Sequence, residues 1–126
     1  MIVRNLENII NTERDIDTKT WRSIRLLLKE DGMGFSLHHT IIKAGTETMI
    51  WYKNHLEAVY CIDGDGEIEI IESGKIHLIK KGMLYALNGH EKHLLRADSD
   101  MHMVCVFMPP CTGSEVHDDE GSYPLL

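Results

Sequence analysis

Short apolar runs, each closed by glycine or acidic turn residues, follow one another along most of the chain. From Glu67 to Ile71 acidic and apolar residues alternate. This two-residue period is typical of a strand with one solvent-exposed and one buried face. The turn 63–66 (Asp-Gly-Asp-Gly) precedes this run and Ser-Gly at 73–74 follows it. The other runs that we expect to be strands are 23–28, 35–42, 46–52, 58–62, 76–79, 84–87, 93–97 and 101–107.

Many short strands at close spacing predict an all-β fold, a small barrel or jelly-roll of antiparallel strands. Helical periodicity is weak and would give one turn from Leu6, Ile9 and Ile10. The three prolines come late and no linker composition occurs. We therefore expect residues 1–126 to form a single domain.

Charge and cysteine content narrow the possible partners. The 126 residues carry 20 acidic and 13 basic side chains, a net charge of -7, which argues against nucleic-acid binding. No apolar run approaches the roughly 20 residues of a membrane span, and no signal peptide is visible, so we expect no membrane association. Three cysteines without a CxxC pair indicate reduced thiols and a cytoplasmic location.

Glycines between residues 45 and 64 have the spacing of the first cupin motif. Five residues separate Gly45 from Trp51, and three residues separate Lys53 from Glu57. A further six residues separate Glu57 from Gly64. In cupins, two histidines occupy the positions held here by Trp51 and Lys53. The spacing therefore favours a cupin barrel with an altered metal-ligand set.

The second cupin motif is also present in altered form. Gly74, Gly82 and Gly89 have its spacing, and Tyr85 stands where a metal-binding histidine would be. Glu57, Tyr85 and nearby histidines then remain as ligands for a divalent first-row metal such as iron. A glutamate beside a strand is usually solvated and a barrel tyrosine usually packs, but their coincidence with cupin ligand positions favours the metal.

Two local patterns extend this candidate site. A hairpin through the turn 88–91 would bring the strand of His93 beside that of Tyr85. His55 and Glu57 are two residues apart, so in a strand they face the same side. Residues that we interpret as ordinary sheet, surface or core positions are His38, His39, His77, His90, His102 and Cys61.

Several long segments resemble the ectoine synthase family of cupins. The longest is Ile-Trp-Tyr-Lys-Asn-His-Leu-Glu-Ala-Val-Tyr-Cys-Ile at 50–62. Further similar segments are 1–6, 21–28, 31–38, 85–87, 95–97, 104–107, 115–118 and 123–125. The chain departs from the family at His39, where glutamate is usual, and at 88–89, where Asp-Lys is usual.

The resemblance implies a homodimeric, iron-dependent enzyme. It assigns Fe(II) binding to Glu57, Tyr85 and His93. It assigns substrate binding to Trp21, Ser23, Arg25, Thr40, Tyr52, Cys105, Phe107, Glu115 and His117. We count His55, which shares a strand face with Glu57, among the substrate-binding candidates.

The implied reaction is ring closure of N-gamma-acetyl-2,4-diaminobutyrate with loss of water, the chemistry of a carbon–oxygen lyase. A base is required for the amine, for which Glu115 and His117 are candidates. Tyr52 and Thr40 would orient the tetrahedral intermediate. Arg25 would clamp the substrate carboxylate. The segment 109–126 is expected to act as a lid.

Two alternatives stay open from the sequence. A non-enzymatic cupin would bind a small metabolite and release it unchanged. A cupin iron dioxygenase would consume oxygen, although the loss of both first-motif histidines argues against its ligand set.

Overall fold

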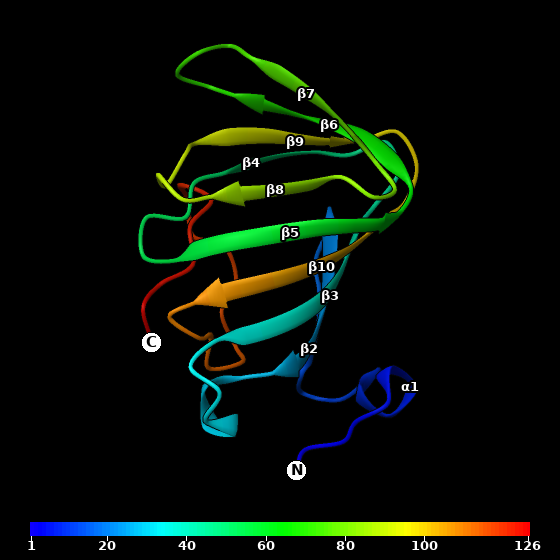
Figure 1. Ribbon diagram of the computed structural model, residues 1–126, viewed down its shortest axis with the longest axis vertical. Helices are drawn as coiled ribbons and strands as arrows, with labels where there is room; N and C mark the ends of the chain where they lie inside the picture. Colours follow the sequence, from blue (N-terminus) through cyan, green and yellow to red (C-terminus); the bar gives the residue numbers. More distant parts are fainter.

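Ten strands form two facing antiparallel sheets in the computed structural model, which describes residues 1–126 (Figure 1). The larger sheet has the order β1 (Asp15–Asp17), β2 (Trp21–Leu27), β3 (Ser36–Ile42), β10 (Met101–Met108), β5 (Leu56–Asp63) and β8 (Leu84–Leu87). The smaller sheet has the order β4 (Glu47–Ile50), β9 (His93–Ala97), β6 (Asp65–Ile70) and β7 (Ile76–Lys80). Helical structure is limited to α1 (Leu6–Ile9) and the 3-10 turn η1 (Lys29–Asp31). The all-β prediction is confirmed.

Strand β10 shows how the sequence pattern builds the core. Met101, Met103, Cys105 and Phe107 are 4% exposed or less, and the residues between them are only half-buried. This two-residue period turns one face of the strand toward the other sheet. Because β10 lies between β3 and β5, its inward residues stand at the centre of the barrel.

The close approach of two loops explains one predicted glycine turn. Gly64, between β5 and β6, has a φ of +87°, which side chains rarely adopt. A Cβ there would lie 2.2 Å from the carbonyl oxygen of Asp100. The Asp-Gly-Asp-Gly signal therefore marks both a left-handed turn and a contact with the loop before β10.

The predicted hairpin between the strands of Tyr85 and His93 is wrong. Strand β8 pairs with β5, whereas β9 pairs with β4 and β6 in the other sheet. The turn between them crosses from one sheet to the other, and His90 there has a positive φ of 55°. The two side chains consequently face each other across the barrel interior rather than along one sheet.

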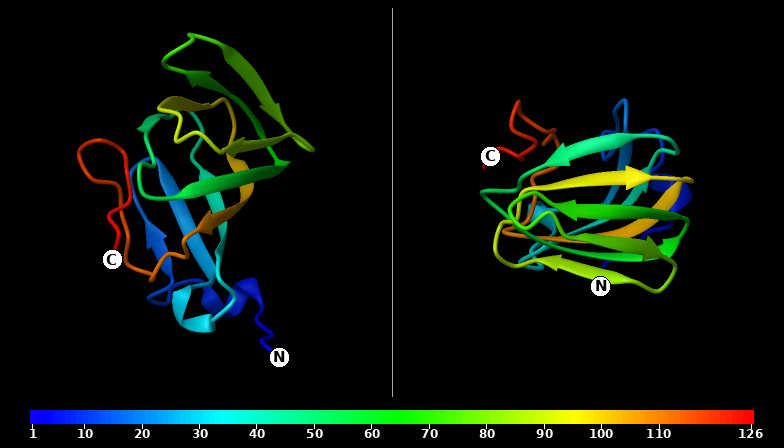
Figure 2. Two further views of the ribbon diagram at one scale, coloured as in Figure 1. Left: turned by 60° about the vertical axis from the view of Figure 1, so that its left-hand side comes forward. Right: turned by 90° about the horizontal axis from the view of Figure 1, so that it is seen from above.

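The segment after β10 packs against the end of the barrel at which that strand finishes (Figures 1 and 2, orange to red). It contains no helix or strand. Its backbone is tied to the connection after β4: the Trp51 amide donates to the Gly121 carbonyl at 2.9 Å, and Asn54 Nδ2 donates to the Tyr123 carbonyl at 3.0 Å. Glu115, Ser122 and Tyr123 are buried.

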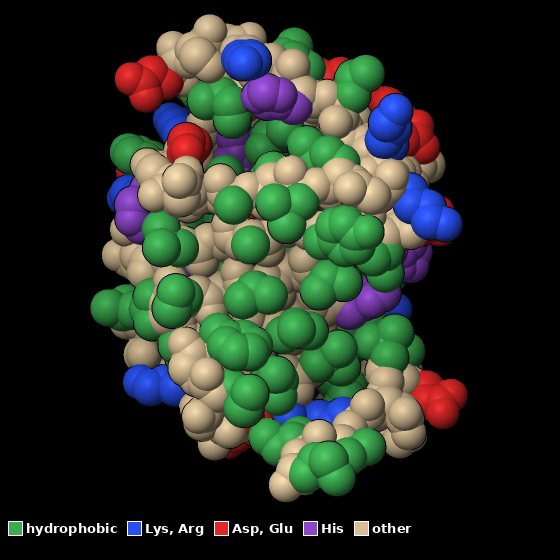
Figure 3. All heavy atoms as spheres, in the orientation of Figure 1, with side chains coloured by type: hydrophobic (Ala, Val, Ile, Leu, Met, Phe, Trp, Pro, Cys, Tyr) green, Lys and Arg blue, Asp and Glu red, His purple; other side chains and the backbone are tan.

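The outer face of the larger sheet is apolar. Figure 3 shows hydrophobic side chains gathered over β5, β8 and β10. They include Leu56, Tyr60, Leu84 and Met108, which are 37–61% exposed. Monomeric proteins rarely expose apolar patches of this continuity.

Among the helices, none has the length and apolarity that crossing a bilayer would require.

Candidate active site

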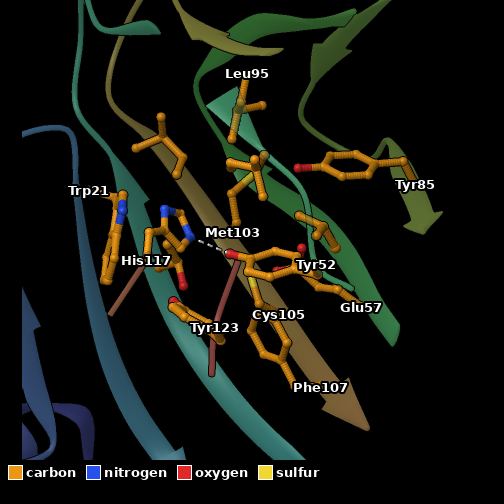
Figure 4. Close-up of a pocket in the computed structure, with 14 residues that line it drawn as sticks. Trp21, Tyr52, Glu57, Tyr85, Leu95, Met103, Cys105, Phe107, His117 and Tyr123 are labelled. Atoms are coloured by element: carbon orange, nitrogen blue, oxygen red, sulfur yellow. Dashed lines mark hydrogen bonds between the residues drawn. The ribbon is translucent and has the colours of Figure 1, made fainter. Parts of the chain in front are cut away.

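A cavity lies between the two sheets, and its wall is mostly apolar. Polar groups in the lining come from Thr40, Glu57 and His117 and from the hydroxyls of three tyrosines. The complete lining is Trp21, Thr40, Ile42, Ile50, Tyr52, Glu57, Val59, Tyr85, Leu95, Met103, Cys105, Phe107, His117 and Tyr123 (Figure 4). A mostly apolar pocket with few polar groups is typical of a small-molecule site.

Most of the predicted site residues meet in this cavity because of strand register. Cys105 on β10 lies opposite Val59 on β5, and Val59 lies opposite Tyr85 on β8. Glu57 lies opposite Phe107, one inward position along the same strands. Of the predicted substrate residues, the lining contains Trp21, Thr40, Tyr52, Cys105, Phe107 and His117.

Of the predicted metal ligands, Glu57 and Tyr85 line the cavity, whereas His93 lies outside its lining. Burial raises the pKa of the Glu57 carboxyl to about 8, so without a cation beside it this side chain is mostly protonated at neutral pH. His93 Nδ1 lies 2.9 Å from the Glu91 carbonyl oxygen, while its buried Nε2 has no hydrogen-bond partner. This orientation of the ring is the one that metal-binding histidines commonly have. The Tyr85 and His93 ring centroids are 6.4 Å apart.

Tyr52 and His117 form a hydrogen-bonded pair inside the cavity. The Tyr52 hydroxyl and His117 Nε2 are 2.8 Å apart (Figure 4). Burial and the nearby Arg25 charge lower the pKa of His117 to about 4, so its ring is neutral at neutral pH. Burial also raises the pKa of the Tyr52 phenol well above 10, which keeps its proton in place. The pair therefore presents a phenolic proton beside a neutral imidazole.

Arg25 does not line the cavity, and its guanidinium is already engaged. It donates to the carbonyl oxygens of Gly113 at 3.0 Å and Glu115 at 2.6 Å, and to the Tyr123 hydroxyl at 3.3 Å. Its Nε donates to the Ser23 hydroxyl at 3.2 Å. A substrate carboxylate would have to displace some of these contacts, so the clamp role of Arg25 stays a prediction.

Glu115, Ser23 and His55 also lie outside the cavity lining. Burial alone would raise the pKa of Glu115, but hydrogen bonds from the Thr112 and Gly113 amides bring it below its usual value. An ionised carboxylate held by two amides is a weak base. The catalytic role expected for Glu115 stays a prediction. His117, whose pKa is also low, differs from Glu115 because it lines the cavity.

Tyr123 is a cavity residue that the sequence did not single out as functional. Its ring lies 4.9 Å from Tyr52, 5.0 Å from His117 and 5.3 Å from Phe107, centroid to centroid. It comes from the C-terminal segment and forms one wall of the cavity. The available signal was a tyrosine that follows the acidic run 115–120.

Comparison with known proteins gives a consistent relationship over the whole length. Residues 1–126 match the family described as Ectoine synthase. An L-ectoine synthase of Halalkalibacterium halodurans is 60% identical over 126 residues, which cover 100% of this chain and 98% of that protein. One of Desulfatibacillum aliphaticivorans is 59% identical, covering 100% and 98%.

Solved structures show the same relationship and the wider fold. The crystal structure of an ectoine synthase from P. lautus has a TM-score of 0.91 at 70% identity, covering 100% of this chain and 91% of that one. A Cupin_2 domain of an XRE family transcriptional regulator from Enterobacter cloacae has a TM-score of 0.60 at 18% identity, covering 73% and 99%. The second match shows the fold alone, and it confirms the predicted cupin architecture.

Proposed function

The chain belongs to the ectoine synthase family, and from this premise we propose that its cavity closes N-gamma-acetyl-2,4-diaminobutyrate into ectoine. The activity is that of an L-ectoine synthase, a hydro-lyase of ectoine biosynthesis. The relatives give no support to the metabolite-binding or dioxygenase alternatives. Our proposal concerns the substrate, the residues that act on it, the metal and the oligomeric state.

The reaction joins the two ends of one small molecule. The substrate's free amine attacks the acetamide carbonyl carbon and forms a carbon–nitrogen bond. The carbonyl oxygen then leaves as water with both protons of the attacking amine, and a cyclic amidine remains. The apolar lining excludes bulk water and holds the substrate folded, which favours an intramolecular dehydration.

Proton transfer falls to Tyr52 and His117 in this proposal. The Tyr52 hydroxyl retains its proton at neutral pH and can donate it to the departing oxygen. The neutral His117 ring, 2.8 Å away, would take a proton from the attacking amine and, as imidazolium, return it to the Tyr52 oxygen. Thr40 offers a further hydroxyl in the lining to orient the tetrahedral intermediate.

Glu57, Tyr85 and His93 would hold Fe(II). Support comes from the buried Glu57 carboxyl, which a nearby cation would ionise, and from the unpartnered His93 Nε2. When bound, the metal supplies Lewis acidity that makes an amide carbonyl a better electrophile. A mixed carboxylate, phenolate and imidazole set suits a divalent first-row metal with positions open for a ligand.

A second copy of this chain is the proposed occupant of the apolar outer face. Leu56, Tyr60, Leu84 and Met108 lie on neighbouring strands and are exposed. A shallow hollow, also apolar, continues this face along Ala58, Ala86 and Val106. A homodimer over β5, β8 and β10 would remove these side chains from water.

The cytoplasmic location stays a prediction, supported by three cysteines that form no disulfide.

The single observation that carries the function is the family match over residues 1–126, joined to a mostly apolar cavity that Glu57, Tyr85 and His117 help to line. The test loads purified protein anaerobically with Fe(II), adds N-gamma-acetyl-2,4-diaminobutyrate and measures ectoine by chromatography. Glu57→Ala should abolish product, while Glu72→Ala, a change at an exposed residue, should retain it. Folded, iron-loaded wild-type protein without ectoine formation would overturn the proposal.

A further inference from the structure

A second cluster of metal-ligating side chains lies beside the C-terminal segment, outside the cavity lining. One potential ligand atom from each of His55, Cys111 and Glu115 lies within 4.8 Å of the others. All three residues are 1% exposed or less. They come from separate parts of the chain: His55 precedes β5, and Cys111 and Glu115 follow β10.

Not every potential metal-ligand atom in this cluster has a hydrogen-bond partner within the protein. His55 Nδ1 is buried without a hydrogen-bond partner. An imidazole nitrogen in that condition forfeits the hydrogen bond that water would have given it. The Glu115 carboxylate is held in place by the Thr112 and Gly113 amides at 2.6 and 2.8 Å, yet each of its oxygens can accept a further partner.

We propose that His55, Cys111 and Glu115 form a second metal site, which binds a borderline-soft divalent cation such as Zn²⁺. Imidazole, thiolate and carboxylate are the three ligand types that zinc takes in proteins, and a fourth position would be open to water. Hard cations such as Mg²⁺ and Ca²⁺ prefer oxygen ligands throughout and are disfavoured here.

A dication bound at this cluster would require the Cys111 thiolate as a ligand. Arg25 Nη1 lies 3.8 Å from Glu115 Oε1, so Glu115 alone would leave a bound dication poorly neutralised. Burial raises the pKa of the Cys111 thiol to about 12, so its proton would leave only when a metal binds. The thiolate and the carboxylate would then leave one positive charge on the cluster with Arg25 included. The Arg25 charge remains shared with the carbonyl oxygens of Gly113 and Glu115.

Such a site would tie the C-terminal segment to the barrel. His55 lies next to β5, while Cys111 and Glu115 flank the backbone carbonyl of Gly113 that Arg25 contacts. A bound metal would hold the segment, and Tyr123 with it, against the cavity. The site does not depend on the proposed reaction, because none of its three residues lines the cavity.

Cobalt substitution tests the site directly, because a thiolate bound to Co²⁺ gives a charge-transfer band in the near ultraviolet. We would titrate full-length, metal-free protein with Co²⁺ under anaerobic conditions and measure the bound metal after desalting. We expect this band in the wild type and two equivalents of metal, one of them at the Glu57 site. Cys111→Ser should lose the band and one equivalent.

Cys105→Ser is the matched control, because Cys105 is also buried and lies in the cavity beside Glu57. This variant should keep the band, and Glu57→Ala should keep it as well while losing the other equivalent. His55→Gln gives a second variant of the site should Cys111→Ser fold poorly, and it should also lose one equivalent. A band that survives in folded Cys111→Ser, or two equivalents retained in folded His55→Gln, would overturn the proposal.

Discussion

The Tyr52 hydroxyl is one oxygen atom on which the proposed chemistry depends. Tyr52→Phe removes the 2.8 Å hydrogen bond to His117 but keeps the ring contacts with Phe107 and Tyr123. We expect kcat to fall at least about tenfold with KM nearly unchanged, since proton transfer in the transition state is what is lost.

Steady-state kinetics with the acetylated diamino acid measures this effect. Tyr60→Phe serves as the control, because it removes a tyrosine hydroxyl from the outer face of the sheet, and it should retain activity. A Tyr52→Phe enzyme with wild-type kcat would exclude this hydroxyl from proton transfer.

His38 gives the protein a measurable pH dependence of stability. Burial, followed by the charges of Arg25 and His55, holds the pKa of His38 well below 6.5. As the pH falls below about 6.5, the unfolded chain gains a proton at this position that the folded protein does not. The free energy of unfolding should therefore decrease by at most about 1.4 kcal/mol per pH unit for this group.

Urea unfolding of metal-free protein at pH 7.5, 6.5 and 5.5 measures this slope. His38→Gln cannot titrate, so its stability should fall less steeply with acid than that of the wild type. Equal slopes in the two proteins would show that His38 is protonated in the folded state.

The sequence predicted individual site residues unevenly. Glu57 and Tyr85 were predictable because two glycine-spaced motifs fix their positions along the strands. The engagement of Arg25 was not, because its partners on 113–123 are 88 to 98 residues away and lie in a segment without periodicity. His38 was interpreted as an ordinary sheet histidine, although the pattern gave no indication that it is wholly buried.

Among the larger elements, the C-terminal segment approaches the barrel most closely at one glycine. Gly121 has a φ of +76°, and a Cβ there would lie 2.3 Å from the Met49 carbonyl oxygen. Gly121→Ala should displace the segment from the cavity, so we expect activity to fall at least about tenfold, as for other misplaced site groups.

Gly34→Ala is the matched control for this change. Gly34 has a similar φ of +82°, but nothing lies within 4 Å of its added Cβ. It should lose only about 1 kcal/mol through backbone strain and keep its activity. Limited proteolysis should cut the C-terminal segment faster in Gly121→Ala than in Gly34→Ala. Equal cleavage of the two variants would contradict the proposed role of Gly121 in holding the segment on the barrel.

Strands were easier to predict than their partners. Alternation located β6 and β10 to within a few residues, because each has one buried face. The three-residue β1 was missed, since Asp-Ile-Asp is too short and polar to show a period. The error over β8 and β9 arose because a short turn is compatible both with a hairpin and with a crossing between sheets, and only packing decides between them.

For the whole molecule, the outer apolar face predicts self-association. Tyr60→Asp places a charge on β5 at the middle of this face, where it would be desolvated in a dimer. We expect the dimer to dissociate at concentrations at least about tenfold higher than for the wild type, a loss of about 1.4 kcal/mol or more.

Light scattering after size-exclusion chromatography over a dilution series measures the change. Leu78→Asp is the control, because Leu78 is 74% exposed but belongs to β7 in the other sheet. A wild-type protein that is monomeric throughout, or an equal effect of the two substitutions, would contradict the proposed interface.

The contacts of Arg25 also bear on how the protein reaches its folded state. This side chain joins β2 to positions 88 to 98 residues further along the chain, so its bonds close some of the longest loops in the molecule. Loops of that length form late when folding begins from local contacts. In a refolding experiment the strands should acquire their circular dichroism before the enzyme regains turnover. The catalytic cavity is then among the last parts of this protein to come into existence.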